Sequence, residues 1–446
     1  MKKILILGAG HSTPYLISYL LDEATAYDWQ VTVADKNLDV AKLRISGYTQ
    51  ANVLQLDIND IARRTQIIQE SDIVINFLPP NFQYVVALEC IHGNTHMITA
   101  SYQDERLPDI DAEAKRKGIL ILNEMGLDPG IDHMSAMDLI ERIKRHGGTV
   151  LAFRSYGSGL PAPEVKVNPL RYCITWNPRN VIMAGETGAQ YLYKSRIKIL
   201  PFHEVFQRTW NVTVEGIGEL EAYPNRDSLR YRTLFGLDQV HTMIRGTLRY
   251  PGWSETWLQI VRLGLPNEIL KIPNITSYTY RELVEMFLPL YAPGADLEHE
   301  VANFLNISPT GKIMENLKWL GLFSNEKIKT QGETAADVLI DLLRRKLVLP
   351  ANARDVVAIY HELEVGYINR RERIISSFVE YGDVGGFTGM AKTVGLPAAI
   401  AAKLVLTGKF TEGGCLIPTN PAVYKPVLHE LREMGYAFKE HSEMIK

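Results

Sequence analysis

The chain has 446 residues, of which 46% are apolar and 22% charged; this is ordinary for a globular protein and enough for two or three domains. Its formal net charge of −3 argues against nucleic-acid and anionic-membrane partners, and no apolar run approaches the ~20 residues of a membrane span. Three widely spaced cysteines, Cys90, Cys173 and Cys415, indicate a reducing compartment, here the cytoplasm, and argue against a disulfide framework.

Short apolar runs alternate with helix-like stretches over roughly the first quarter of the chain. The runs expected to be strands are 4–7, 31–34, 51–56, 73–76, 96–99 and 119–122, and the stretches expected to be helices are 14–21, 38–45, 61–69, 82–92 and 110–117. Strands buried on both faces read as continuous apolar runs. The α/β alternation therefore predicts a doubly wound parallel sheet of the Rossmann type.

The first predicted strand ends in a glycine-rich loop that is close to G-x-G-x-x-G, with Thr13 at the third glycine position. Gly8 allows the tight turn, and Gly10 lets a pyrophosphate approach the backbone. The third position serves helix–strand packing, so a small residue such as threonine is tolerable there. We expect the phosphates of a dinucleotide at the helix start formed by His11, Ser12 and Thr13.

Acidic residues end the second and third predicted strands. Asp35, 22 residues after Thr13, is placed to accept hydrogen bonds from the adenosine ribose and to repel a 2′-phosphate, so we expect NAD rather than NADP. The adjacent Lys36 would reduce that preference, which leaves NADP open. Asp57 is expected near the adenine. The fourth predicted strand is followed by two further candidate cofactor contacts, Leu78 and Pro79. The alternative is a purely structural turn with a solvated Asp35.

The next ionisable candidates follow the predicted strand that ends near residue 122. Asp128 lies in an Asp-Pro-Gly turn, and Asp132 and His133 open the following helix. These groups could form a site, or the turn could mark a domain boundary with Asp132 as a helix cap. Histidine and cysteine spacings predict no metal site.

The middle of the chain contains arginines whose neighbours are rich in glycine, proline or aromatic residues. They are Arg226, Arg230 and Arg249. Such arginines suit bidentate binding of carboxylates, so we expect a substrate with several carboxylates, the alternative being solvated surface loops. Residues 296–366, including ANARDVVAIYHEL (351–363), show helical spacing and predict a helical insertion. A strand at 373–380 and a small-residue helix at 387–408 follow.

The chain resembles glutamate-forming saccharopine dehydrogenase, also called saccharopine reductase, over essentially its whole length. The motifs that carry the resemblance occur in the family's order: SYQDE (101–105), NEMGLDPGIDHM (123–134), SYGSGLPAPE (155–164), NPLRYCITWNPR (168–179), YPNRD (223–227) and GTLRYPGW (246–253). The implied domains are a Rossmann domain (1–127), a mixed α/β substrate and dimerisation domain (128–295), a helical insertion (296–366), a return to the substrate domain (367–390) and C-terminal helices completing the Rossmann domain (391–446).

The resemblance implies an oxidoreductase of lysine metabolism that acts as a homodimer. Its NAD(P)-dependent reaction oxidises the secondary amine of saccharopine, and the imine is hydrolysed to glutamate and 2-aminoadipate 6-semialdehyde; the reverse direction is a reductive condensation. Tyr102 and Asp128 are the implied acid–base candidates, with His133 a weaker one. The residues implied to line the saccharopine site are Ser101, Tyr102, Asp128, Arg226, Thr247 and Arg249.

Two positions depart from the family pattern. Gly157 stands where family members carry a cysteine, so a thiol is not required there, and Asp35 stands where NADP-using relatives have a Cys-Arg type pair. One alternative is an imine reductase like carboxynorspermidine dehydrogenase, although a diamine binder should show acidic residues in place of Arg226 and Arg249. The other is a catalytically silent nucleotide-binding redox sensor.

Overall fold

The computed structural model describes residues 1–48, 51–185, 188–289 and 296–445. Its chain divides into two compact units. The first unit comprises Met1–Thr149 and Phe378–Lys439, and the second comprises Val150–Ser377 and Glu440–Lys446. Each unit is described by itself.

The first unit is built on a seven-stranded sheet in the order β16-β6-β5-β4-β1-β2-β3, in which every neighbouring pair is parallel. The strands are β1 (Lys2–Leu7), β2 (Trp29–Asp35), β3 (Ala51–Gln55), β4 (Ile73–Asn76), β5 (His96–Thr99), β6 (Leu120–Leu122) and β16 (Gly414–Leu416). The Rossmann-type sheet expected from the sequence is thus confirmed. Its seventh strand, β16, comes from the C-terminal part of the chain.

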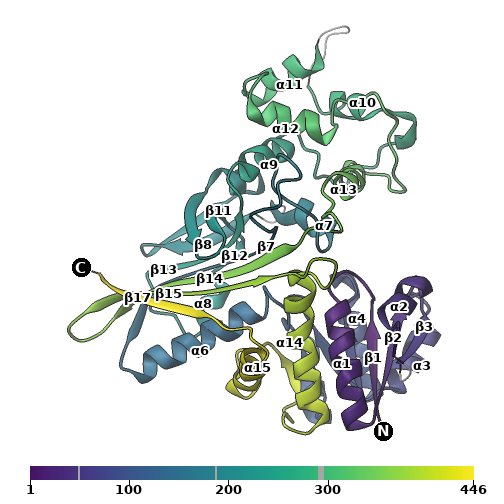
Figure 1. Ribbon diagram of the computed structural model, residues 1–446, viewed down its shortest axis with the longest axis vertical. Coiled ribbons are helices and arrows are strands. Elements are labelled where there is room, and N and C mark those ends of the chain that lie inside the picture. The colour runs from purple at the N-terminus through teal and green to yellow at the C-terminus, as the bar shows by residue number, and fades with distance from the viewer. Residues whose placement is uncertain (49–50, 186–187, 290–295, 446) are drawn as a thin grey trace. The chain divides into compact units, whose positions relative to one another are not determined.

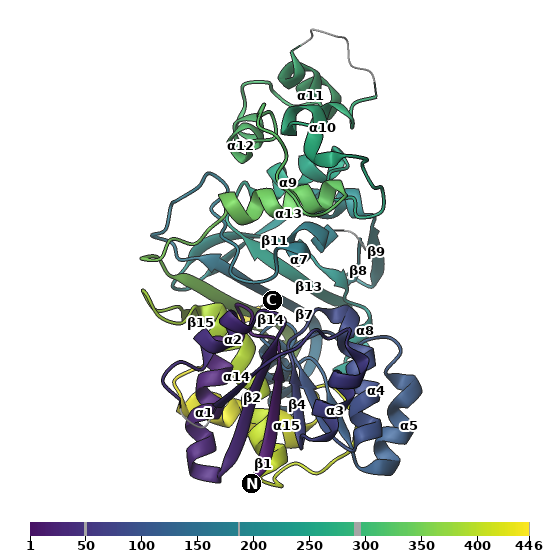
Figure 2. The same cartoon turned by 90° about the vertical axis from the view of Figure 1, so that its right-hand side faces the viewer.

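Helices cover both faces of this sheet, with α3, α4 and α5 on one side and α1 and α14 on the other (Figure 2). The helices of the unit are α1 (Pro14–Tyr27), α2 (Leu38–Arg44), α3 (Ile61–Gln69), α4 (Gln83–Gly93), α5 (Pro108–Lys117), α6 (Ile131–Arg145), α14 (Gly389–Leu406) and α15 (Pro421–Glu433). The central strand β1 is buried from Ile4 to Leu7, at no more than 1% exposure.

Helix α14 lies alongside α1 (Figure 1). It is the one helix of the described chain that is long and apolar enough to cross a membrane, and 72% of it is buried inside the structure, as in a core helix. Its glycine and alanine residues allow the close approach to α1, which agrees with the closely packed helix expected for this segment.

The second unit is built on a ten-stranded mixed sheet. Its main path runs β10-β11-β13-β7-β14-β15-β17, and β8, β9 and β12 join it beside β13. The strands are β7 (Thr149–Pro161), β8 (Ala189–Tyr193), β9 (Arg196–Leu200), β10 (Trp210–Val214), β11 (Gly218–Pro224), β12 (Arg226–Asp227), β13 (Thr242–Arg249), β14 (Asp355–Gly366), β15 (Arg371–Tyr381) and β17 (Lys439–Ile445).

Short helices accompany this sheet. They are α7 (Pro178–Ile182), α8 (Arg230–Leu234), α9 (Trp253–Arg262), α10 (Tyr280–Glu285), α11 (Leu297–Leu305), α12 (Lys312–Leu320) and α13 (Ala335–Lys346). The last three of them, α11 to α13, fall within the segment 296–366 that was expected to be helical. Capping boxes begin two of them: Thr279 with Glu282 at α10, and Thr334 with Asp337 at α13.

One element of the predicted helical insertion is wrong. Part of the segment ANARDVVAIYHEL, expected to be helical, forms strand β14. The run Val356–Tyr360 is buried throughout, and a fully buried apolar run cannot be assigned to helix or strand by periodicity alone. The β-branched residues Val356, Val357 and Ile359 favour the strand.

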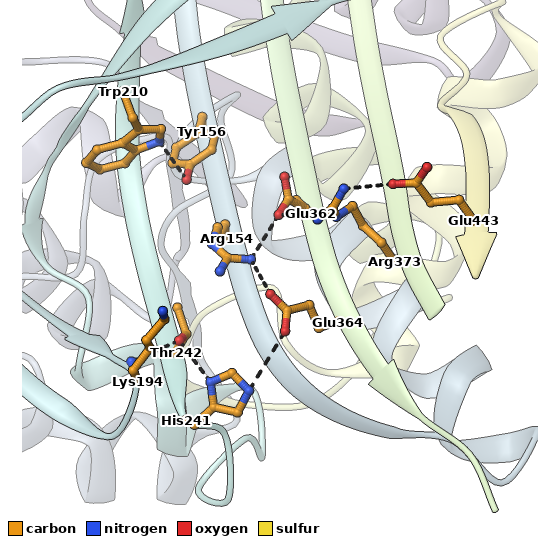
Figure 3. A network of polar contacts seen from close by, with 10 residues as sticks. All are labelled: Arg154, Tyr156, Lys194, Trp210, His241, Thr242, Glu362, Glu364, Arg373 and Glu443. Carbon is orange, nitrogen blue, oxygen red and sulfur yellow. Dashed lines mark hydrogen bonds and ion pairs between the residues drawn. The ribbon is translucent and has the colours of Figure 1, made fainter. Parts of the chain in front are cut away.

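Ion pairs connect neighbouring strands of the second unit (Figure 3). Arg154 of β7 donates from Nη1 to Glu362 Oε1 at 2.9 Å and to Glu364 Oε1 at 3.0 Å, both on β14. Arg373 of β15 pairs with Glu443 of β17 at 2.7 Å. Burial alone would lower the pKa of Arg154, but the two glutamates raise it above its ordinary value.

Candidate functional site

The glycine-rich loop of the first unit has the geometry of a phosphate-binding turn. Gly8 has φ +97°, and a Cβ there would lie 3.0 Å from the Phe77 carbonyl oxygen. Around Gly10, in contrast, no atom of the described residues other than its chain neighbours lies within 4 Å of a built Cβ, so its backbone faces open space. Thr13 is 1% exposed, and its hydroxyl donates to the Gly10 carbonyl oxygen at 3.0 Å. The threonine therefore fills the packing position of the third glycine, just before Pro14 begins α1.

The carboxylate of Asp35 fixes this loop to the end of β2. Its Oδ2 accepts the Ala9 N–H at 2.8 Å, and its Oδ1 accepts the Asn37 N–H at 2.8 Å. Arg44 of α2, which the sequence analysis missed, donates from Nε to the Ala9 carbonyl oxygen at 3.2 Å. Burial lowers the pKa of Arg44, and the nearby Asp35 carboxylate offsets part of that shift.

The other predicted cofactor residues lie at the same carboxyl edge of the sheet. Asp57 forms an ion pair with Lys36, with Nζ and Oδ2 3.3 Å apart, and the backbone N–H of Asn59 together with Lys36 lowers the pKa of Asp57. The Leu78 N–H donates to Asn76 Oδ1 at 3.1 Å, and Pro79 follows. His11 is exposed and Ser12 half-buried at the start of α1. The carboxyl ends of parallel strands are where such sheets bind their ligands.

Helix α14 packs closely against this loop and the first turn of α1. A Cβ built on Gly395 would lie 2.8 Å from Leu16 Cβ and 3.0 Å from the Ser12 carbonyl oxygen. The glycine thus lets α14 touch α1 at the turn that is expected to hold the phosphates. Because this contact joins residues almost 400 positions apart, no local sequence signal could have revealed it.

We expect Gly395→Ala to weaken dinucleotide binding by about tenfold, since overpacking at such a contact typically costs ~1–3 kcal/mol and here displaces the loop. Isothermal titration with NAD and NADP would measure the loss. Leu404→Ala, which removes a buried side chain (6% exposed) about two and a half turns farther along α14, is the control. It should lower the melting temperature and leave dinucleotide affinity unchanged. Equal affinity in both variants would contradict the role given to Gly395.

A second cluster in the first unit contains the predicted acid–base pair. The Tyr102 hydroxyl donates to Asp128 Oδ1 at 3.3 Å, and both side chains are half-buried. Ser101 is next to Tyr102, and its carbonyl oxygen accepts the Glu124 N–H at 3.0 Å. The structure therefore brings these three predicted residues together.

Two buried ionisable residues adjoin this pair. His133, a weak candidate at the sequence level, and Glu124, which was not singled out there, are both 0% exposed, and His133 Nε2 lies 2.8 Å from Glu124 Oε2. Asp132, expected either in a site or as a helix cap, accepts the Gly130 N–H at 2.7 Å and lies on the other side of His133.

In the second unit, Arg249 is buried in an aromatic cage. It is 4% exposed, and its guanidinium carbon lies 4.7 Å from the ring centre of Tyr172 and 4.9 Å from that of Trp253. Nη1 donates to Ser158 Oγ and to the Leu248 carbonyl oxygen, both at 2.9 Å. Among the described residues, Arg249 Nε has no hydrogen-bond partner. A desolvated guanidinium with an unpaired donor is suited to bind an anionic ligand group.

The other substrate candidates of the second unit lie near this strand. Thr247 precedes Arg249 by two residues on β13, so both side chains lie on one face of the sheet. Its register partner on β7 is Gly157, the position where the family pattern has a cysteine. Arg226 is exposed, with φ +52°, and β12 places it next to β8. The sequence did not single out Ser158, Tyr172 and Trp253 as residues that surround Arg249, although all three lie in the motifs quoted above.

The described residues contain no group of three or more His, Cys, Asp or Glu side chains arranged to hold a metal ion. The three cysteines are free thiols.

Comparisons with known proteins cover both units. Residues 4–122 match the family model of the saccharopine dehydrogenase NADP-binding domain, and residues 126–436 match that of the saccharopine dehydrogenase C-terminal domain. The NADP(+), L-glutamate-forming saccharopine dehydrogenases of Pyricularia oryzae and Saccharomyces cerevisiae are both 32% identical to the chain. The alignment covers 97% of this chain and 97% of the first protein, and 98% of this chain and 99% of the second.

The mitochondrial alpha-aminoadipic semialdehyde synthase of Bos taurus is also 32% identical, over 99% of this chain and 48% of that protein. Among solved structures, the apo saccharopine dehydrogenase (L-Glu forming) of Saccharomyces cerevisiae matches with a TM-score of 0.84 at 31% identity, covering 99% of this chain and 100% of that one.

Proposed function

Since the chain belongs to the saccharopine dehydrogenase family, we propose that it oxidises saccharopine to L-glutamate and 2-aminoadipate 6-semialdehyde with a nicotinamide dinucleotide. The observation that carries the proposal is the Tyr102–Asp128 hydrogen bond, which joins an acid to a base on neighbouring loops of the nucleotide-binding unit. Similarity over nearly the whole length to glutamate-forming enzymes supports this choice of reaction.

The reaction needs one hydride acceptor and a route for protons. The bound nicotinamide supplies the acceptor for the hydride that leaves the carbon next to the secondary amine. The Asp128 carboxylate can take a proton through the Tyr102 hydroxyl as water adds to the resulting imine, and can return it to the nitrogen as glutamate leaves. Held as a pair, the two side chains orient each other for both transfers.

The substrate's carboxylates require cations. Saccharopine has three of them, and Arg249 offers a buried guanidinium whose Nε is unpaired, with Thr247 on the same strand face. Arg226 is the second cation assigned to the substrate. A diamine substrate would place its ammonium groups against these arginines, which argues against the carboxynorspermidine-type reaction.

Purified protein should therefore reduce a nicotinamide dinucleotide when given saccharopine and remain inactive with carboxynorspermidine. The absorbance of the reduced nicotinamide reports both reactions. Activity with carboxynorspermidine alone would overturn the assignment, and inactivity with both substrates would favour a redox sensor.

For the cofactor, we propose NAD in preference to NADP, although the relatives named above are NADP(+) enzymes. The support is Asp35, whose carboxylate is held by two backbone N–H groups at the end of β2, where the adenosine ribose binds in such sheets. A 2′-phosphate carries about −1.5 to −2 charge and would be repelled there. Lys36 is engaged with Asp57 rather than directed to Asp35.

Asp35→Ser should make the two cofactors converge, because it removes both the ribose contacts and the repulsion. In the wild type, kcat/KM should favour NAD by about tenfold, or ~1.4 kcal/mol. Parallel steady-state assays with NAD and NADP measure the ratio. Asp109→Ser, which removes an exposed carboxylate from the first turn of α5, is the control and should leave the ratio unchanged. A wild type that prefers NADP would show that Asp35 does not face the ribose.

We also propose that the enzyme is a cytoplasmic homodimer. The three free thiols support a reducing compartment. Exposed apolar side chains at Ile197 and Ile199 of β9 and at Phe202 just after it, which are 58%, 72% and 48% exposed, offer a surface that a second copy could cover.

A further inference from the structure

Three ionisable side chains that the proposed mechanism does not use are buried together in the first unit. Glu124 and His133 are 0% exposed, and Asp132 is 2% exposed. His133 Nε2 lies 2.8 Å from Glu124 Oε2, and Nδ1 lies 3.1 Å from Asp132 Oδ2. Burying two carboxylates is unfavourable unless they are paired. Because this burial is unfavourable without pairing, we looked to the contacts of the three side chains for a role other than packing.

Glu124 holds the loop that carries Tyr102. Its Oε1 accepts the N–H of Gln103 at 3.1 Å, and its own N–H donates to the Ser101 carbonyl oxygen at 3.0 Å. These two contacts flank Tyr102 on both sides. Glu124 itself has φ +61°, a conformation that is unfavourable for a residue with a Cβ and that tends to occur at functional sites.

Asp132 holds the loop that carries Asp128. Its Oδ1 accepts the N–H of Gly130 at 2.7 Å, two residues after Asp128. This turn requires glycine, because Gly130 has φ +147° and a Cβ there would lie 2.0 Å from the Gly126 carbonyl oxygen. The contact to Asp132 thus fixes a turn whose conformation other residues cannot easily adopt.

His133 lies between Glu124 and Asp132. Its Nε2 is within hydrogen-bonding distance of Glu124 and its Nδ1 is within ion-pair distance of Asp132, so a positive charge on the ring offsets the repulsion between the two carboxylates. A neutral ring would present a lone pair to one of them. The charged form therefore stabilises the positions of both carboxylates, each of which accepts a hydrogen bond from one of the two loops.

We propose that His133, as an imidazolium between Glu124 and Asp132, is a positioning residue that sets the separation of Tyr102 and Asp128. This inference rests on the proposed function, which assigns proton transfer to that pair. His133 acts through the two carboxylates and their loops and has no direct part in the chemistry.

The direct test is a crystal structure and a kinetic analysis of His133→Gln, which keeps one donor nitrogen but loses the positive charge and the second donor nitrogen. The Tyr102 hydroxyl and Asp128 Oδ1, 3.3 Å apart in the wild type, should move beyond hydrogen-bonding distance. We expect kcat to fall by about tenfold or more, while the affinity for the dinucleotide, measured by titration, changes by less than about twofold.

Two further variants separate positioning from stability. Glu124→Gln keeps the side-chain shape, removes one charge and should reproduce the effect on kcat if His133→Gln does not fold. Leu139→Ala, which removes a buried side chain (2% exposed) from α6, should lower the melting temperature and leave kcat near the wild-type value. A Leu139→Ala variant that loses as much kcat would overturn the proposal, because instability alone would then explain the loss.

The structural readout is independent of which reaction the enzyme catalyses. A wild type inactive with saccharopine would contradict the proposed function, yet the Tyr102–Asp128 distance in the variants would still decide the role of His133. An unchanged distance in His133→Gln or Glu124→Gln overturns the positioning role.

Discussion

Replacing Asp128 by asparagine is expected to lower kcat by about 10²- to 10⁴-fold, the usual contribution of a positioned acid–base group. The amide keeps the shape of the side chain but cannot take up a proton at neutral pH. Since Tyr102 donates to Asp128, Tyr102→Phe should cause a similar loss. The double variant should lose little more than either single variant, because residues that act as a unit are not additive.

The measurements are single-turnover and steady-state rates with saturating saccharopine and cofactor. Asp138→Asn is the control: this α6 residue pairs with Arg142 at 3.1 Å. It should retain wild-type kcat. Losses that add fully in the double variant would mean that Tyr102 and Asp128 act in separate steps rather than as one relay.

Arg249→Lys should raise the KM for saccharopine by about 10- to 160-fold, or ~1.5–3 kcal/mol, the range for a hydrogen bond to a charged group. Lysine keeps the charge but has neither the planar fork nor the stacking surface that fits between Tyr172 and Trp253. Dinucleotide affinity should not change, because the glycine-rich loop of the first unit is the proposed nucleotide site.

Steady-state kinetics and dinucleotide titration test this in parallel with thermal unfolding. Arg262→Lys, at an exposed position at the end of α9, is the matched control and should leave KM unchanged. If Arg249→Lys binds saccharopine normally while its melting temperature falls, the cage is structural and the carboxylates are held elsewhere.

The Rossmann-type sheet was predictable because its signals are local. Each strand is a short apolar run, and glycine and proline mark the first turn, so the elements from β1 to β6 agree with the expected ranges within two residues at each end, except that α1 continues six residues beyond the expected end at residue 21. The exception, β14, is buried on both faces, and its unbroken apolar run does not show a strand's alternation. The local sequence pattern was sufficient to predict an element wherever that pattern was compatible with only one type of secondary structure.

The residues of the candidate site likewise fall into two groups: those that a local sequence signal predicts and those that depend on long-range contacts. Gly8, Asp35 and Tyr102 follow from a turn, a strand end and a motif. Gly395 and Arg44 do not, because their roles depend on contacts that close only when distant helices pack against the loop. The buried charges around His133 also escape sequence reasoning, since a histidine on a helix gives no sign of which carboxylates surround it.

The most direct test of the central claim identifies the products of saccharopine oxidation. Purified enzyme would be incubated with saccharopine and NAD, with NADP in parallel, and the products analysed by mass spectrometry after the aldehyde has been trapped. We expect glutamate and 2-aminoadipate 6-semialdehyde, each formed in a one-to-one ratio with the reduced cofactor. Lysine and 2-oxoglutarate in their place would show that the other carbon–nitrogen bond of saccharopine is broken, and would contradict the account.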